Sequence, residues 1–241
     1  MIRLFDFISS LLGLIILSPV FFIFSFLVWK EDKHNPYYVS MRAGKGGKPF
    51  KFIKFRSMRI GADKSGVDST SSNDSRITDV GRKIRKYKVD ELPQLFNVLI
   101  GQMSLVGPRP NVKREVDLYT NEEKKLLNIK PGVTSLSSIV FSDEGEILNC
   151  HNDPDLAYNQ LIRPWKNKLD LFYVSKHSFF NSYLIVFITV IAIFNKLKAL
   201  SIVNKFLVSN GADIELVNVC LRQEDLQPSP PPGADEIVTS R

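Results

Sequence analysis

The most informative stretch of this sequence reads RKYKVDELPQLFNVLIGQMSLVGPRP. It contains two adjacent acidic residues, Asp90 and Glu91, and it ends with Arg109 between Pro108 and Pro110. Adjacent carboxylates supply the oxygen ligands that magnesium prefers. The two prolines restrict the backbone around the arginine, and a pre-positioned guanidinium suits a phosphate group. These residue types predict a site that handles phosphate groups with the help of a divalent metal.

Three basic residues upstream are weaker candidates for contacting phosphate. Arg85 lies five residues before Asp90, and the alternative for it is a solvated charge on a helix. Lys54 and Arg56 belong to residues 50–60, FKFIKFRSMRI, where apolar and basic side chains alternate. Such alternation predicts a strand or a basic amphipathic surface. A basic strand that faces acidic lipid headgroups would explain Lys54 and Arg56 equally well.

The apolar residues after the acidic pair predict that Asp90 lies where a helix begins, with Pro93 in the first turn. The positive end of that helix and nearby Arg85 should keep the pKa of Asp90 low and its carboxylate ionised. An ionised Asp90 can act as a nucleophile, while Glu91 would help to hold magnesium or take a proton. The ordinary alternative is that the two acids only complement the helix dipole.

The elements that must position these side chains can be read from the hydrophobic pattern. It predicts helices over residues 78–87, 112–129 and 156–173, with Thr78 as the cap of the first. An apolar helical stripe continues from residue 92 to residue 99. Residues 61–75 are rich in serine, aspartate and glycine and predict a mobile loop.

The N-terminus is almost wholly apolar from Leu4 to Trp29. That length is enough to span a bilayer, for which roughly 20 apolar residues suffice. Ser18 and Pro19 interrupt it near the middle, and proline bends or breaks a helix because it lacks a backbone donor. Two interpretations are open: a kinked spanning helix, or a helical hairpin that enters the membrane and returns to the same face.

The C-terminal part holds a second apolar segment and a proline-rich tail. Residues 179–194 are strongly apolar but short, which favours an interfacial or buried helix over a spanning one. The tail from Gln227 onward is rich in proline, and we expect it to be disordered.

Charge and cysteine content narrow the class of protein. The chain of 241 residues has 32 Lys and Arg against 25 Asp and Glu, a net charge of +7, which favours anionic partners such as nucleic acid, acidic lipid or phosphate-bearing substrates. Its two cysteines, Cys150 and Cys220, suggest neither a zinc site nor a disulfide framework. A reducing environment that faces the cytoplasm is the simplest interpretation.

Several motifs, taken in order, resemble a known family. They are the Ser18-Pro19 break, Lys54-Phe55-Arg56-Ser57-Met58, Asp90-Glu91-Leu92-Pro93-Gln94-Leu95-Phe96-Asn97-Val98-Leu99, Met103-Ser104-Leu105-Val106-Gly107-Pro108-Arg109-Pro110 and Lys130-Pro131-Gly132-Val133-Thr134. Over about residues 1–195 the chain resembles the bacterial sugar transferases, the small monotopic phosphoglycosyl transferases of glycan assembly. The resemblance implies a predominantly helical α/β fold, with a re-entrant membrane helix hairpin over residues 1–30. A domain with a small sheet would follow over 31–195 and include the interfacial segment, with an extension over 196–241.

The resemblance also implies an activity. Members move a sugar phosphate from a nucleotide diphosphate sugar to polyprenyl phosphate, at the cytoplasmic face of the bacterial inner membrane. They need Mg²⁺, and the aspartate that corresponds to Asp90 becomes covalently phosphorylated. Arg85 resembles the family arginine that contacts phosphate. The expected partners are therefore the nucleotide sugar, undecaprenyl phosphate and membrane lipids. A second copy of the chain, in a homodimer, is a further candidate.

The chain departs from the family pattern at three places, and two other functions are alternatives to the transfer. Gln102 stands where the family usually has aspartate, Ser135-Leu136 where Gly-Trp is common, and Lys88 where a small residue is common. If the segment over residues 135–140 shapes the sugar or nucleotide pocket, substrate choice changes with it. These departures motivate a catalytically weak homologue that binds lipid or acts as a scaffold. The net charge motivates a membrane-tethered nucleic-acid binder, but the chain lacks a recognised reading motif, and we expect no nucleic-acid partner.

Overall fold

The computed structural model describes residues 1–64, 70–222 and 225–239, so residues 65–69 of the predicted loop lie outside the described part. The α-helices are α1 (Ile2–Ile16), α2 (Ser18–Asp32), α3 (Asp79–Lys86), α4 (Gln94–Leu99), α5 (Lys113–Val116), α6 (Leu136–Val140), α7 (Glu144–Leu148), α8 (Pro154–Ala157), α9 (Arg163–Ser175), α10 (Phe179–Phe194), α11 (Lys196–Ser209) and α12 (Ile214–Leu221). The strands are β1 (Tyr37–Ala43), β2 (Pro49–Phe55), β3 (Ser104–Val106) and β4 (Gly132–Thr134). The predominantly helical α/β prediction is confirmed, but the strands form two small sheets where one was expected.

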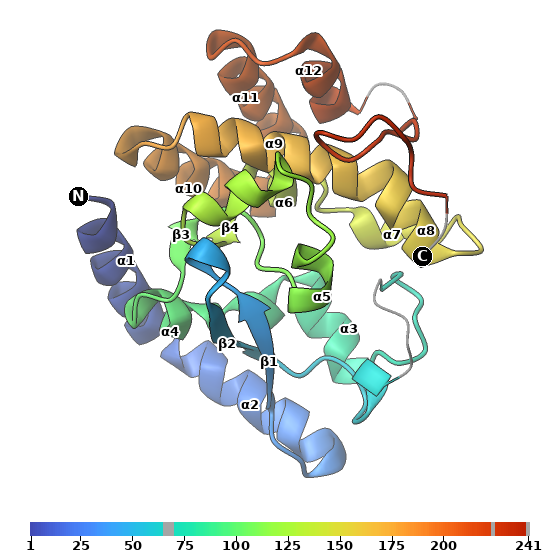
Figure 1. Cartoon of the computed structure of the whole chain (residues 1–241). Coiled ribbons are helices and arrows are strands. Elements are labelled where there is room, and N and C mark those ends of the chain that lie inside the picture. Colours follow the sequence, from blue (N-terminus) through green and yellow to red (C-terminus); the bar gives the residue numbers. More distant parts are fainter. Residues whose placement is uncertain (65–69, 223–224, 240–241) are drawn as a thin grey trace.

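Three layers follow one another across the molecule (Figure 1). The N-terminal helices α1 and α2 lie along one side, the β1–β2 hairpin with α3, α4 and α5 occupies the middle, and α9 to α12 lie beyond it, with α10 meeting α1 directly. The strands β1 and β2 are antiparallel, with Tyr37 opposite Phe55 and Ala43 opposite Pro49. β3 and β4 are parallel and lie where the middle layer meets the C-terminal helices.

The N-terminal apolar segment is broken at the expected place. α1 ends at Ile16, α2 begins at Ser18, and the two axes differ by 62°. Pro19 lies in the first turn of α2, where its missing N–H leaves no helical hydrogen bond unmade. Within the described ranges no single helix is long and apolar enough to cross a bilayer, whereas α1 and α2 pass that test as a bent pair.

Large apolar side chains are exposed on the two N-terminal helices and on α10. They include Leu4, Ile8, Leu12, Ile15, Ile16, Phe22, Ile23, Phe26, Phe180, Phe187, Ile193 and Phe194. The ring of Phe5 packs edge-on against Phe179 and Tyr183, at centroid distances of 5.7 and 5.9 Å, and so joins α1 to α10. An exposed apolar surface of this extent indicates contact with a membrane or another apolar partner.

The predicted helices of the domain are only partly confirmed. Thr78 caps α3 by accepting a hydrogen bond from the Gly81 amide at 2.9 Å. Residues 156–173 are helical almost throughout, with one π-turn, η5 (Tyr158–Ile162), between α8 and α9. The single helix over 112–129 is wrong. Thr120 and Glu123 form reciprocal bonds there, with the Glu123 amide 3.1 Å from the Thr120 hydroxyl, and these start a new 3-10 turn.

The main core lies between the C-terminal helices and α6. It contains Leu136, Ile139, Val140, Leu169, Tyr173, Ile185, Ile188, Val203, Leu207 and Cys220, all of which are buried. Two smaller clusters hold the middle layer, with Phe55 and Ile84 against Phe21 of α2, and Phe52 against Val98 and Met103. Val89 and Leu92, which flank the acidic pair, pack against the first of these clusters.

The proline-rich tail, for which we expected disorder, is irregular over residues 225–239 and lies along η5 and α9. The Ser229 amide donates to the Gln160 carbonyl at 3.0 Å, and the Gln160 side chain donates to the Val238 carbonyl at 2.7 Å. The Trp165 indole donates to the Gln227 carbonyl at 3.3 Å.

Candidate active site

The acidic pair lies on a short 3-10 turn, η3 (Val89–Glu91), and not at the start of a long helix. The turn is set up by Lys88, whose φ of 56° places it in the left-handed region and reverses the chain after α3. α4 begins only at Gln94, after Pro93. A helix dipole therefore does not act directly on Asp90.

The carboxyl group of Asp90 is buried, with 9% of the residue exposed. Its Oδ1 atom has no hydrogen-bond partner among the described residues. Burial raises the pKa of Asp90, the neighbouring charge of Glu91 raises it further, and Lys54 and Arg85 act in the opposite direction. The low pKa expected from the sequence is wrong, because the sequence does not reveal how far this side chain is withdrawn from water.

Glu91 and Arg109 form the central ion pair of the site. The Arg109 Nη1 atom donates to Glu91 Oε1 at 2.7 Å. Burial acts to raise the pKa of Glu91, but the guanidinium of Arg109 opposes it, and the net shift is downward. The carboxylate of Glu91 raises the pKa of Arg109 in turn. Glu91 is therefore ionised and Asp90 is the harder of the two to ionise.

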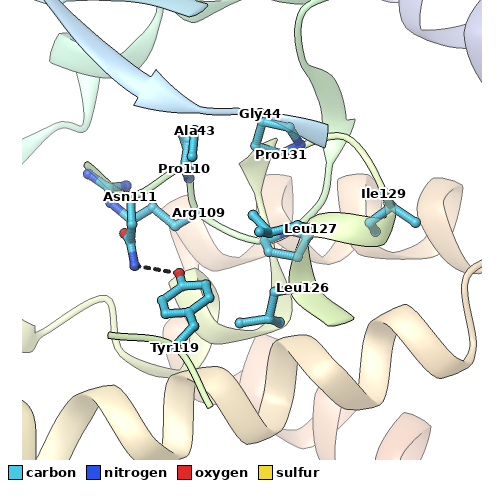
Figure 2. A pocket seen from close by; sticks show the side chains of 11 residues that line it. Ala43, Gly44, Arg109, Pro110, Asn111, Tyr119, Leu126, Leu127, Ile129 and Pro131 are labelled. Atoms are coloured by element: carbon cyan, nitrogen blue, oxygen red, sulfur yellow. Dashed lines mark hydrogen bonds between the residues drawn. The ribbon is translucent and has the colours of Figure 1, made fainter. Parts of the chain in front are cut away.

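The turn that carries Arg109 is fixed by the β3–β4 sheet. The Gly107 amide donates to the Thr134 carbonyl, and the Gly132 amide to the Pro108 carbonyl, both at 3.0 Å. A Cβ atom on Gly107 would lie 2.3 Å from the Lys130 carbonyl oxygen, so the close approach of the two chains requires glycine. Behind the turn, Asn111 donates to the Tyr119 hydroxyl at 2.9 Å, and Pro110 and Pro131 lie in the same wall (Figure 2).

Basic side chains gather around the acidic pair. Lys54 of β2, Arg85 of α3 and Lys88 all interact with the charge of Asp90 and act to lower its pKa. Burial lowers the pKa of Lys54 to about 8, against the effect of Asp90. Arg42 of β1 also belongs here, since its pKa is lowered by burial and by the charge of Arg109. Sequence analysis missed Arg42 because β1 itself was not predicted.

Arg56, also predicted to bind phosphate, is not brought to this cluster. Its Nη2 atom donates to Asp32 Oδ1 at 2.7 Å, and its Nε atom donates to the Asn35 carbonyl at 2.9 Å. Arg56 thus joins the end of α2 to the domain. The break at Ser18 and Pro19 lies between α1 and α2, and these two helices carry none of the charged side chains of this cluster.

The opposite wall of the site comes from residues that sequence analysis did not single out. Glu144 begins α7, and the Lys166 ammonium of α9 donates to its Oε2 atom. The charges of Glu144 and Tyr158 both act to raise the pKa of Arg109. Lys166 lies under the ring of Tyr158, with 5.7 Å between the ammonium and the ring centroid. An acid, a phenol and an amine from α7, η5 and α9 therefore interact electrostatically with Arg109.

Two departures from the family pattern have structural explanations. The Gln102 Oε1 atom accepts a hydrogen bond at 2.8 Å from Asn97, whose amide also donates to the Lys51 carbonyl, so this position helps to hold α4 on β2. Residues 136–140 form the buried helix α6, capped by Ser135. This segment belongs to the core, and the wall of the site begins after it, at Glu144.

The protein offers two carboxylates for a metal ion. Within the described ranges no group of three or more histidine, cysteine, aspartate or glutamate side chains could hold one. Magnesium typically binds through one or two carboxylates and completes its shell with water and substrate phosphates. Asp90, with its unpartnered Oδ1 atom, and adjacent Glu91 fit that kind of site.

Several known proteins are similar to this chain in sequence. The UDP-glucose:undecaprenyl-phosphate glucose-1-phosphate transferase of Klebsiella pneumoniae is 38% identical over 176 residues, 70% of this chain and 37% of that protein. The UDP-N-acetylgalactosamine-undecaprenyl-phosphate N-acetylgalactosaminephosphotransferase of Aeromonas hydrophila is 30% identical over 69% of this chain and 41% of its own length. The exopolysaccharide production protein ExoY of Rhizobium meliloti is 33% identical over 79% of this chain and 84% of its own.

This chain therefore spans less than half of the first two relatives and most of the third. The family described as bacterial sugar transferase matches residues 1–196. That match covers the bent helix pair α1–α2, the acidic pair, the proline-flanked arginine, Glu144 and Lys166. The chain belongs to the bacterial sugar transferase family.

Proposed function

We propose that this protein transfers a sugar 1-phosphate from a UDP-sugar to undecaprenyl phosphate, as an early membrane step of polysaccharide synthesis. The observation that carries the proposal is the buried, unpartnered Oδ1 atom of Asp90 beside the Glu91–Arg109 pair. The names of the relatives from Klebsiella and Aeromonas support the choice of substrates.

The first step uses Asp90 as the nucleophile. Its carboxylate oxygen attacks the phosphorus of the sugar 1-phosphate, the bond from that phosphorus to the UMP oxygen breaks, and UMP leaves. Arg109, Arg85 and Lys54 stabilise the negative charge on the diphosphate and on the departing UMP. A magnesium ion held by Asp90 and Glu91 would neutralise further charge on the phosphate oxygens.

The second step regenerates the enzyme. A phosphate oxygen of undecaprenyl phosphate attacks the phosphorus of the aspartyl phosphosugar, and the bond between that phosphorus and Asp90 breaks. The product is the sugar joined to the lipid through a diphosphate. Dividing the transfer into two displacements lets one cluster of cations serve two anionic substrates in turn.

UMP release from a UDP-sugar, measured with and without undecaprenyl phosphate, tests this proposal. A covalent phosphosugar adduct on Asp90, seen by intact mass with UDP-sugar alone, should accompany release. A scaffold or lipid-binding homologue would bind membranes but release no UMP. A nucleic-acid binder would retain nucleic acid at moderate salt and likewise release none.

We also propose that the N-terminal segment is re-entrant, with both of its ends at the cytoplasmic face. At the start of α1, Arg3 donates to the Val98 and Leu99 carbonyls, each at 2.6 Å. Further along α1, buried Asp6 accepts hydrogen bonds from the Ser104 hydroxyl at 2.9 Å and the Leu105 amide at 3.0 Å. A helix that crossed the bilayer would carry Arg3 away from these partners.

The other end of the segment is held by the same domain. The Glu31 carboxylate accepts a hydrogen bond from the Asp79 amide at 3.0 Å, and Asp32 pairs with Arg56. The exposed apolar side chains of α1, α2 and α10 then lie toward the lipid. An apolar groove of about 420 Å³ opens at the bend between Ser18, Phe22 and Phe96, and we assign it to the lipid chain of the acceptor.

Labelling of Ile2→Cys tests the topology. Because both ends should be cytoplasmic, this cysteine should resist a membrane-impermeant thiol reagent in intact cells and react after lysis. Native Cys150, exposed on the domain, is the matched reference in the parent chain and is replaced by serine in the test chain. Joint replacement of Ser18 by Leu and Pro19 by Ala should favour a continuous helix. Labelling of Ile2→Cys in intact cells without that replacement would contradict the re-entrant arrangement.

Arg109→Lys should lower kcat/KM by about 100-fold or more, because lysine keeps the charge but loses the planar fork that bonds phosphate and Glu91 together. Steady-state UMP release measures the effect. Arg82→Lys, on the exposed face of α3, is the matched control and should retain activity. Unchanged kinetics in Arg109→Lys would assign Arg109 to structure alone.

The pH profile should reveal Lys54. Burial lowers its pKa to about 8, so its ammonium is lost as the pH rises through 8, and kcat/KM should fall over the same range. Lys54→Arg should keep the charge and move this alkaline limb to higher pH. An alkaline limb that stays in place in Lys54→Arg would show that another group titrates.

A further inference from the structure

The chain continues beyond the family match with two helices that pack tightly on the rest of the protein. From α11, Val203 and Leu207 enter the main core, and from α12, Leu216 and Cys220 do so. Figure 1 shows the two helices over α9 and α10, on the side away from α2. This extension, residues 196–222, is therefore an integral part of the folded domain.

Arg222 follows the last residue of α12 and reaches back to the segment between α6 and α7. Its Nη2 atom lies 2.8 Å from Asp143 Oδ1 and 3.3 Å from the Val140 carbonyl oxygen. Its guanidinium lies over the ring of Phe141, 4.5 Å from the centroid. Arg222 has a φ of 52°, a left-handed backbone conformation that residues other than glycine rarely adopt. This conformation ends α12 and turns the chain at Arg222.

Both carboxylate oxygens of Asp143 form ion pairs with basic residues of the extension. Lys196, at the first position of α11, places its Nζ atom 2.8 Å from Asp143 Oδ2, while Arg222 binds Oδ1. Asp143 stands at the N-cap position of α7, yet its side chain makes no capping hydrogen bond there. The carboxylate that would ordinarily cap α7 is instead turned outward to the extension.

The residue after Asp143 is paired to α9 and interacts electrostatically with the active site. Glu144 pairs with Lys166, and its charge acts on the guanidinium of Arg109. Gly145 accepts a hydrogen bond from the Ser72 amide at 3.1 Å, and a Cβ atom there would lie 2.7 Å from the Ser72 hydroxyl. The first turn of α7 is thus held between the extension on one side and residue 72 on the other, with little room to shift.

We propose that Arg222 is a positioning residue for the UDP-sugar: through Asp143 it fixes the first turn of α7, so that Glu144 presents its carboxylate to hydroxyl groups of the bound donor. The inference rests on the proposed transfer function and deepens it. A carboxylate is an acceptor for vicinal hydroxyls. Both the sugar and the ribose of the donor carry such hydroxyls, so the two sources share one chemistry.

Arg222→Met, with Lys205→Met on the exposed surface of α11 as the matched control, tests the inference. In Arg222→Met the Glu144 carboxylate should lose its position against the UDP-sugar. The KM for UDP-sugar should therefore rise by about tenfold, while kcat stays within about twofold because the chemical step at Asp90 is untouched. The KM for undecaprenyl phosphate should not change. Asp143→Asn, which retains the Phe141 and Val140 contacts of Arg222, should give the same split if Arg222→Met folds poorly.

A double-mutant cycle shows whether Arg222 acts through Glu144. Glu144→Gln should raise the donor KM, and adding Arg222→Met should raise it by less than about twofold more, since the contact is already lost. Inhibition by UDP identifies the hydroxyls: its inhibition constant rises with the KM if Glu144 binds ribose, and stays constant if Glu144 binds the sugar.

Different results would overturn the transfer function and the positioning role of Arg222. Absence of UMP release from every UDP-sugar by the unmodified protein would overturn the transfer function itself. Active unmodified protein, together with an unchanged donor KM in both Arg222→Met and Asp143→Asn, would overturn the positioning role. Fully additive effects of Arg222→Met and Glu144→Gln would also overturn it.

Discussion

Asp90→Asn is expected to lower the turnover number by roughly three or more powers of ten, because an amide cannot replace an ionised carboxylate as the nucleophile. UMP release in the presence of undecaprenyl phosphate measures the loss. Intact mass of the variant after incubation with UDP-sugar should show no phosphosugar adduct. Turnover near that of the unmodified protein in Asp90→Asn would refute the assignment of Asp90.

The stability of the same variant provides an independent check. The pKa of Asp90 is raised in the folded state, so its ionised form is disfavoured there and weakens the fold as the pH rises through that pKa. Asp90→Asn should therefore unfold at a higher temperature than the unmodified protein near neutral pH. Glu91→Gln is the contrasting variant: the pKa of Glu91 is lowered, so its charge stabilises the fold above its ordinary pKa, and its loss should lower the unfolding temperature.

Removal of magnesium is expected to abolish UMP release. The diphosphate of the donor carries charge that Asp90, itself an anion when reactive, must approach, and a divalent cation offsets that repulsion. EDTA followed by re-addition of Mg²⁺ should remove and restore activity. Full activity in EDTA would contradict the requirement.

Glu91→Gln separates metal binding from the nucleophile. Loss of one of two carboxylate ligands should raise the concentration of Mg²⁺ needed for half-maximal rate by about tenfold or more, while the phosphosugar adduct on Asp90 still forms at high Mg²⁺. Glu146→Gln, on the exposed side of α7, is a control that should leave the magnesium dependence unchanged.

The sequence was informative about the fold wherever a local signal was strong. The break at Ser18-Pro19 and the apolar segment over 179–194 were predicted and are observed as the α1–α2 bend and as α10. The helix over 112–129 was wrong, because the reciprocal bonds of Thr120 and Glu123 compete with a continuous helix. β1 was missed because its side chains do not alternate cleanly between apolar and polar.

The site was predictable only on one side. Asp90, Glu91, Arg85 and Arg109 lie within 25 residues of one another, and turn chemistry marks them. Glu144, Tyr158 and Lys166 come from three separate elements, α7, η5 and α9, and only tertiary packing brings their charges to bear on Arg109. The direction of the pKa shift at Asp90 depends on burial in the same way, which no local pattern encodes.

The anchoring of Arg3 and Asp6 has a consequence for how the protein is made. Their partners lie 95 to 99 positions further along the chain, so none exists when α1 and α2 leave the ribosome. Until about residue 105 has been synthesised, Asp6 is an unpaired acid in an apolar helix, which is costly in lipid. The bent arrangement is thus completed after synthesis of the domain, and residues 1–32 expressed alone lack the contacts that distinguish it from a spanning helix.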